Sequence, residues 1–168
     1  MAHLEDRRLE MTLGLFDPPA GVKLWHGGAT VLGALRGVRP EEAAWKPAPD
    51  RHSIWDLTLH IAYWNYAIRR RITGGAHGGF PRSPSNWPAP PEEITASSWK
   101  RDRALLREYH TLLLEAMRDF DPSRLDELSG GQSEYTYADL LMGIVLHDTY
   151  HAGQIQMVKR LYASLAGT

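Results

Sequence analysis

The sequence predicts an all-α fold, a four-helix bundle whose helices run up-down-down-up. Four stretches of the chain carry apolar residues at intervals of three, four and seven, which is the spacing of one helix face. Two of these stretches begin with a capping-box pattern, and we find no segment with the two-residue alternation of a strand. The 168 residues favour a single domain over residues 1–168, with the bundle core at about 20–165.

The first predicted helix covers residues 21–38 and follows the sequence DPPAG. The apolar residues that recur along it at helical intervals are Leu24, Val31, Leu35 and Val38. Residues 39–52 contain three prolines, and this stretch is therefore predicted to be an irregular connection.

The second predicted helix begins at Ser53, where the sequence SIWD places Asp56 at the third helical position of a capping box. Its apolar stripe consists of Leu57, His60, Ile61, Trp64 and Ile68. The helix is predicted to end at the sequence TGG. Residues 74–91 are rich in Gly, Pro and Ser, so we expect no regular element there.

The third predicted helix begins near Thr95 or Ser97 and reaches Phe120, with apolar residues seven apart. The fourth begins at a capping box formed by Thr136 and Asp139. Its stripe consists of Leu140, Ile144, His147, His151, Ile155, Val158, Tyr162 and Leu165. The connection after the second helix, about 20 residues, could run the roughly 30 Å length of a helix. We therefore expect the second and third helices to be parallel and joined by a long crossover.

His147 and His151 stand four residues apart on the apolar stripe of the fourth helix. At that spacing the two rings lie about 40° apart around the axis and about 6 Å apart along it, so both can bind one ion. Buried imidazoles need partners and repel each other when protonated, and a divalent cation removes both problems. His60 on the stripe of the second helix would complete a three-histidine site with an open position. The alternative is a set of core histidines that donate to carbonyl or carboxylate oxygens.

The remaining histidines have no comparable neighbours in the sequence, and we expect solvated or capping roles for them. They are His3, His26, His52, His77 and His110. Of these, His26 in the sequence LWHGG is the one that we single out as a candidate pocket residue.

The sequence His147-Asp148-Thr149-Tyr150-His151 is similar to the His-Glu-x-x-His motif of zinc proteases. Those enzymes use a glutamate as general base and take a third ligand from further along the chain. Here an aspartate takes the place of the glutamate, and residues 152–168 contain no His, Asp or Glu. We therefore reject the protease reading and expect Asp148 to support a ligand or lie at the surface.

Three passages of the sequence resemble the DinB-like (YfiT-like) family of metal-binding four-helix bundles. They are SIWDLTLHIAYWN, LHDTYHAGQIQMVKRL and the long middle connection between them, which together extend the resemblance over roughly residues 20–165. The most specific part is the run from Tyr150 to Ile155, which contains His151, Gly153 and Gln154. The resemblance implies that His60, His147 and His151 are the metal ligands, in an up-down-down-up bundle.

The resemblance also implies a homodimer, and a reaction in which a thiol such as mycothiol, bacillithiol or glutathione takes part in transfer or isomerisation. The bound metal would activate the thiolate. Gly153 carries a physical signal of its own, because glycine within a helix costs about 1 kcal/mol relative to alanine. We read it as a close approach of another helix or a ligand. Gln154 would orient a ligand or bond across the bundle, or simply lie at the edge of the stripe.

Composition limits the remaining functions. With 19 basic and 20 acidic side chains the net charge is −1, which gives no reason to expect nucleic acid or an anionic membrane as partner. The chain has no cysteine, so a thiol must be brought in by a cofactor. The first ten residues lack the apolar region of a signal peptide and no run of about 18 apolar residues suggests a membrane span, so we expect a cytoplasmic protein.

Three functions remain open from the sequence. The first is a metal-dependent thiol transferase or isomerase whose apolar substrate pocket is walled by aromatic residues, namely Trp25, Tyr63, Trp64 and Trp87. The second is a metal-dependent hydrolase, in which Asp148 or a carboxylate of the middle loop serves as base. The third is a non-catalytic bundle that binds a metal or a small ligand, or merely dimerises. Neutral imidazoles bind Zn²⁺, Ni²⁺, Fe²⁺ or Cu²⁺, so the sequence does not identify the ion. His26 and Tyr150 are further candidate pocket residues.

Overall fold

The computed structural model describes residues 7–75, 78–130 and 133–166, and the regular elements in these ranges are helices. They are α1 (Arg8–Phe16), α2 (Val31–Ala34), α3 (Pro40–Ala44), α4 (Ile54–Thr73), α5 (Ala96–Arg118), a 3-10 helix (Pro122–Arg124) and α6 (Tyr137–Ala166). The one β-type pairing among the described residues is an isolated bridge between Leu128 and Thr136. The all-α prediction is confirmed.

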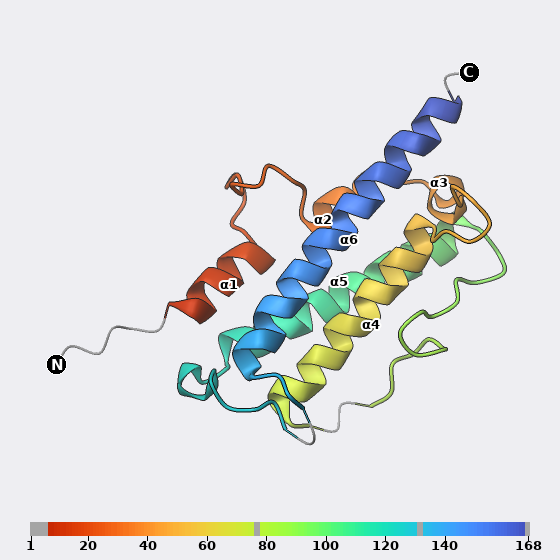
Figure 1. Cartoon of the computed structure of the whole chain (residues 1–168). Coiled ribbons are helices and arrows are strands. Elements are labelled where there is room, and N and C mark those ends of the chain that lie inside the picture. The colour runs from red at the N-terminus through yellow and green to blue at the C-terminus, as the bar shows by residue number, and fades with distance from the viewer. Residues whose placement is uncertain (1–6, 76–77, 131–132, 167–168) are drawn as a thin grey trace.

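Of the three long helices, α4 lies beside both α5 and α6 (Figure 1). The Trp55 ring lies 4.9 Å from that of Trp99, and the Tyr66 ring 5.5 Å from that of Tyr109, so α4 and α5 run in the same direction. Helix α6 runs against them, because His60 contacts His151 while Trp64, one turn later, contacts His147. The chain after α4 therefore crosses back along the bundle before α5 begins.

Local capping explains where the long helices begin and end. The Ser53 backbone N–H donates to Asp56 Oδ2, and the Asp56 N–H donates to Ser53 Oγ, so the predicted capping box is present at α4. Thr136 and Asp139 form the same reciprocal pair at the start of α6. Gly74 ends α4 in the left-handed region at φ 62°, where a side chain would be strained. These predicted boundaries are confirmed.

The prediction of a first helix over residues 21–38 is wrong. Only Val31–Ala34 is helical there, while α1 lies upstream at Arg8–Phe16. Gly21 and Gly27 have left-handed φ angles of 84° and 67°, which interrupt the periodic stripe that suggested a continuous helix. The connection predicted to be irregular also contains the short helix α3, which begins at Pro40, a residue favoured at the first helical position.

A polar layer crosses the waist of the bundle between two apolar clusters. One cluster includes Trp55 and Ile155 and the other includes Ile72 and Leu141, all almost fully buried. Between them α4 contributes Asn65, α5 contributes His110, and α6 contributes the run from His147 to His151. Buried polar side chains from all three long helices therefore meet at this level, which is where a site would be buried.

The chain between α4 and α5 is tied to the bundle by a buried carboxylate. Asp102 on α5 is 0% exposed and accepts two hydrogen bonds from the Arg82 guanidinium, at 2.6 and 3.1 Å. Its other oxygen accepts from Trp55 Nε1 at 2.8 Å. This network fixes the loop that carries residues 83–91 against α4 and α5. Within the described part of the chain, no helix is long and apolar enough to cross a membrane.

Candidate metal centre

The structure brings His60 of α4 together with His147 and His151 of α6. One ring nitrogen from each lies within 4.8 Å of those of the other two, and the Nε2 atoms of His60 and His147 are 3.0 Å apart. His60 and His151 are buried, at 5% and 6% exposure, whereas the His147 side chain retains 24%. The cluster is therefore enclosed on two sides and accessible at His147.

Each imidazole uses its Nδ1 to donate to an oxygen. The acceptors are the Asn86 carbonyl for His60, at 2.6 Å, and Asp148 Oδ1 for His147, at 3.1 Å. For His151 the acceptor is Gln154 Oε1, at 2.6 Å. Because these oxygens accept, the hydrogen of each neutral ring resides on Nδ1 and the Nε2 lone pair is left free.

Three free lone pairs at this separation fit a divalent cation. Carbonyl and carboxylate partners, the alternative that the sequence left open, account for the Nδ1 atoms but leave the Nε2 lone pairs of His60 and His147 facing each other. Two lone pairs with no hydrogen between them repel. Nitrogen ligands at about 2.0–2.1 Å from a tetrahedral Zn²⁺ would lie roughly 3.4 Å from each other, close to the observed separation.

Burial keeps His60 and His151 neutral. Loss of hydration lowers the pKa of His60 to about 4, and the nearby His151 and His147 imidazoles contribute in the same direction. Burial likewise lowers the pKa of His151 to about 4, against the opposing effect of its bond to Gln154. At neutral pH both rings are therefore uncharged, the form that binds metal.

The same shifts predict how the stability of the metal-free protein depends on pH. Unfolded histidine binds a proton near pH 6.5, whereas His60 and His151 bind one only near pH 4 in the folded state. The unfolded state thus holds more protons between these values, so the free energy of unfolding should fall as pH drops from about 6.5 to 4. Urea unfolding of chelator-treated protein across this range measures the slope.

Burial raises the pKa of Asp148. Over part of the range from pH 6.5 to 4, this shift changes the free energy of unfolding in the direction opposite to the two histidines. The variant His60→Asn isolates the histidine contribution because Asp148 is retained in both proteins. The slope should be shallower in the variant, and an unchanged slope would contradict the assignment.

The loop after α4 covers one side of the cluster. The Trp87 ring stacks on His60 at 3.8 Å between centroids, and His52 stacks on the other face of Trp87 at 3.6 Å. Trp64 Nε1 donates to Asn86 Oδ1, which holds the residue whose carbonyl orients His60. These contacts position His60 from outside its own helix and block access from the loop side.

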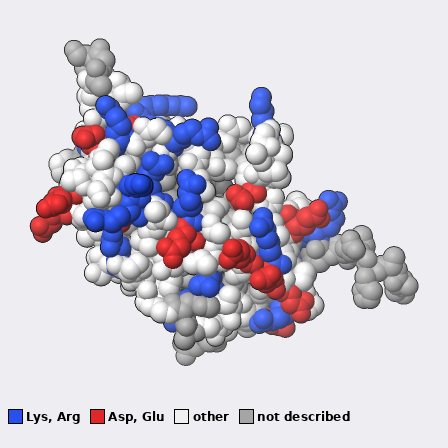
Figure 2. All heavy atoms as spheres, turned by 180° about the vertical axis from the view of Figure 1, so that it is seen from behind, with Lys and Arg blue, Asp and Glu red and all other residues white. Residues whose placement is uncertain are grey.

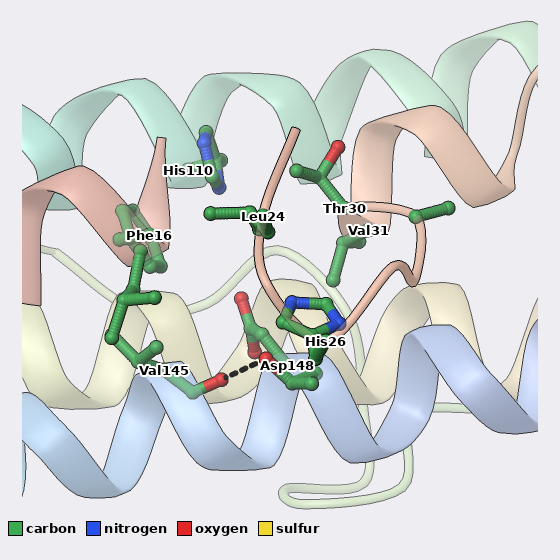
Figure 3. A pocket seen from close by; sticks show the side chains of 11 residues that line it. Phe16, Leu24, His26, Thr30, Val31, His110, Val145 and Asp148 are labelled. Carbon is green, nitrogen blue, oxygen red and sulfur yellow. Dashed lines mark hydrogen bonds between the residues drawn. The ribbon is translucent and has the colours of Figure 1, made fainter. Parts of the chain in front are cut away.

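Asp148 lies between the cluster and a small cavity. Its Oδ1 accepts from His147, and Asp148 and His110 both line a cavity of about 20 Å³ (Figure 3). A volume of this order holds one water. His110 is 6% exposed and stacks on Phe16, so the expectation that it is solvated or a cap is wrong. Burial, opposed by the charges of Asp148 and Asp17, lowers the His110 pKa.

Other predicted pocket residues lie elsewhere. Trp25 is fully exposed on the irregular segment between α1 and α2, so the expectation that it walls a pocket is wrong. His26 is also exposed; it lines the cavity of Figure 3, on the Asp148 side of α6, and its Nδ1 accepts from the Gly28 N–H. Tyr63 contacts the edge of Trp64. No described atom outside its own helix segment lies within 4 Å of a Cβ built on Gly153, so the close approach expected there is absent from this chain.

The predicted Tyr150 and Gln154 form a chain of contacts behind His151. Gln154 Nε2 donates to Tyr150 Oη at 3.1 Å, which leaves Gln154 Oε1 to accept from His151. Asn86 and His52 were missed by sequence reasoning, because a loop of Gly, Pro and Ser carries no periodic signal that would place them. His3 and His77 lie outside the described residues.

Replacing Gln154 with leucine should weaken metal binding by about 10–100-fold, because His151 loses the acceptor that sets its tautomer and orientation. Competition with a chromophoric chelator measures the affinity. Gln156→Leu is the matched control, since Gln156 lies on the same helix about 200° around the axis from Gln154. Equal affinities in the two variants would show that Gln154 does not orient His151.

Comparison with known proteins agrees with this geometry. The family model described as the DinB superfamily matches residues 26–155, a range that contains all three clustered histidines. Neither the curated proteins nor the solved structures yielded a match.

Proposed function

Because the chain belongs to the DinB superfamily and its three imidazoles fit a divalent cation, we propose that it is a metal-dependent enzyme that uses a low-molecular-weight thiol in transfer or isomerisation. The observation that carries the proposal is that one ring nitrogen from each of the three histidines lies within 4.8 Å of the other two, at a site open at His147. His60, His147 and His151 would hold Zn²⁺, Ni²⁺ or Fe²⁺. The chain has no cysteine, so the thiol must come from a cofactor.

When bound, the cation supplies positive charge that lowers the pKa of a thiol beside it. In the transfer reaction the thiolate sulfur forms a bond to an electrophilic carbon of the substrate. The bond to the leaving group breaks, the leaving group departs with the electron pair, and the thiol proton passes to solvent. Burial keeps His60 and His151 neutral, hydrogen bonds orient all three imidazoles, and Trp87 excludes water from the His60 side.

The hydrolase alternative needs a general base at the open side of the cluster. Asp148 is a poor candidate, because its Oδ1 accepts from His147 and the residue is only 5% exposed. The third alternative, a non-catalytic bundle, implies that removing a histidine leaves any activity unchanged.

One assay separates the three functions. Metal-loaded protein is mixed with 1-chloro-2,4-dinitrobenzene and with mycothiol, bacillithiol or glutathione in turn, and with no thiol as control. We expect turnover that requires both a thiol and the metal and that is lost in His60→Ala. Turnover independent of every thiol would favour the hydrolase and overturn the proposal, and activity that survives His60→Ala would rule out catalysis at this cluster.

We further propose that the protein acts on a small molecule as a homodimer. Acidic and basic side chains are mixed on the face drawn in Figure 2, and a net charge of −1 does not favour nucleic acid. An apolar stripe on α6 supports the dimer: its members, spaced four, three, four and four apart, are Leu146, Tyr150, Gly153, Met157 and Leu161. The four large side chains are 42–64% exposed, and Gly153 among them would allow a partner helix to approach.

Replacing Met157 with glutamate should convert the dimer into a monomer, because a charge would be buried within the stripe. Light scattering coupled to size exclusion measures the mass. Met11→Glu is the control, since Met11 is 60% exposed on α1 and outside the stripe. A dimer that persists in the Met157 variant would locate the interface elsewhere.

The arrangement of the first helices also belongs to this proposal. Helix α1 contacts α5 through the stacking of Phe16 on His110, and α2 is held to α6 because Lys159 Nζ donates to the Ala34 and Arg36 carbonyls. We propose that α1 and α2 together replace the first helix of an up-down-down-up four-helix bundle.

A further inference from the structure

An apolar pocket adjoins the open side of the histidine cluster. It has a volume of about 250 Å³ and lies between the C-terminal half of α4 and the N-terminal half of α6. Its walls include Trp64, Ile68, Leu140, Gly143 and Ile144, and His147 closes one end. The accessible side of the cluster and the pocket therefore share the His147 ring.

The pocket is elongated along α6. Asp139 and Tyr135 line its other end, and Asp139 precedes His147 by eight residues, which is about 12 Å along a helix. No lysine or arginine of the described residues lines the pocket. The Asp139 carboxylate already accepts from the Thr136 hydroxyl and backbone N–H, at 2.7 and 2.8 Å, and it keeps anions away from that end.

Gly143 leaves one wall of the pocket open. A glycine inside a helix costs about 1 kcal/mol relative to alanine, yet nothing in the fold requires one here. Its φ is not in the left-handed region, and a Cβ built on it would meet no described atom within 4 Å outside its own helix segment. The absence of a side chain at Gly143 therefore leaves space in the pocket.

Trp64 connects the pocket to the cluster. Its indole is fixed by the hydrogen bond from Nε1 to Asn86, and its ring centroid lies 6.1 Å from that of His147 and 6.4 Å from that of His60. A flat apolar group lying against this ring would reach the His147 edge of the cluster without displacing the loop.

From the volume, the apolar walls and the absence of cations, we propose that this pocket binds the apolar part of an uncharged small-molecule substrate, with its reactive end at His147. The assignment rests on the proposed function, because it makes the pocket the place where the electrophile meets the metal-bound site. It excludes substrates whose anionic group must enter the pocket, since no lysine or arginine in the described part of the chain lines it.

Binding of N-phenyl-1-naphthylamine, an uncharged aromatic fluorophore, tests the pocket directly. We expect fluorescence enhancement on binding to the wild-type protein, and affinity at least about tenfold lower for Gly143→Leu, whose side chain fills the space. Gly14→Leu is the control, because Gly14 is also an exposed helical glycine with nothing near its Cβ, but lies on α1. The sulfonated analogue 1-anilinonaphthalene-8-sulfonate should bind the wild-type protein at least about tenfold more weakly.

Equal probe affinity in the wild type and Gly143→Leu, or stronger binding of the sulfonated analogue, would overturn the proposal. So would a change of oligomeric state in Gly143→Leu with unaltered probe binding, which would make this face a protein contact. If Gly143→Leu does not fold, Gly143→Ala takes its place and should lower the affinity for the fluorophore by a smaller factor. An unchanged affinity in Gly143→Ala would also overturn the proposal. The probe should still bind to chelator-treated protein and to His60→Ala, because the pocket does not need the metal. The pocket can therefore be tested even if the metal site proves to be wrong.

Discussion

Replacing His60 with alanine should reduce bound metal from roughly one equivalent per chain to under about a tenth of one after gel filtration. His60 is the single ligand that α4 contributes, and its Nε2 lies 3.0 Å from that of His147. Without it, two imidazoles one turn apart on α6 remain, and a site of two neutral ligands holds a divalent ion at least about 100-fold more weakly.

The measurement is elemental analysis of protein purified without an affinity tag and incubated with Zn²⁺ or Ni²⁺. His26→Ala is the matched control, because His26 is exposed and outside the cluster. It should retain the wild-type metal content. Full loading of His60→Ala would mean that the metal ligands are other residues, and an absence of metal from the wild type after incubation would defeat both enzyme hypotheses.

The second large effect is expected at Asp102. Asp102→Ala should lower the free energy of unfolding by about 3–5 kcal/mol, because it leaves Arg82 and the buried Trp55 indole without their acceptor. Arg82 is 33% exposed and can recover part of its hydration, which favours the lower end of that range. Urea unfolding followed by circular dichroism measures the change.

The control for Asp102 is a surface ion pair. Asp50→Ala removes the partner of Arg51 where both side chains are about 70% exposed, so it should change stability by less than about 1 kcal/mol. Because Arg82 ties the loop that carries Asn86 and Trp87, Asp102→Ala should also weaken metal binding. A loss of stability no greater than that of Asp50→Ala would show that the network does not hold the loop.

The polar layer at the waist places buried polar groups at the level of the candidate metal centre. Asn65, His110 and Asp148 are all buried at the level of the metal centre, and the Asn65 side chain lies close enough to Asp148 to influence its pKa. Buried polar groups of this kind cost free energy, and the two apolar clusters on either side compensate for it. A simpler bundle would have apolar residues at this level.

Much of the fold could be predicted because its signals are local. The beginnings of α4 and α6 depend on a side chain and a backbone group three residues apart, and the end of α4 depends on one glycine. The three histidines were found because each lies on an apolar stripe where an imidazole is conspicuous. Helical periodicity and capping are properties of short segments, so the sequence by itself determined these helices and the candidate ligands.

Only the tertiary structure decided the rest. The stripe over residues 21–38 obeyed helical periodicity, but glycines with left-handed φ angles break it, and α1 packs against α5 and α6 instead. The acceptors that set each tautomer include Asn86, 26 residues from His60, and the buried environment of His110 depends on Phe16 in another helix. The pocket beside Gly143 exists because Trp64 and Ile68 of α4 lie near Leu140 and Ile144 of α6 in the folded chain. These features arise from contacts between residues far apart in the chain, and no local pattern encodes them.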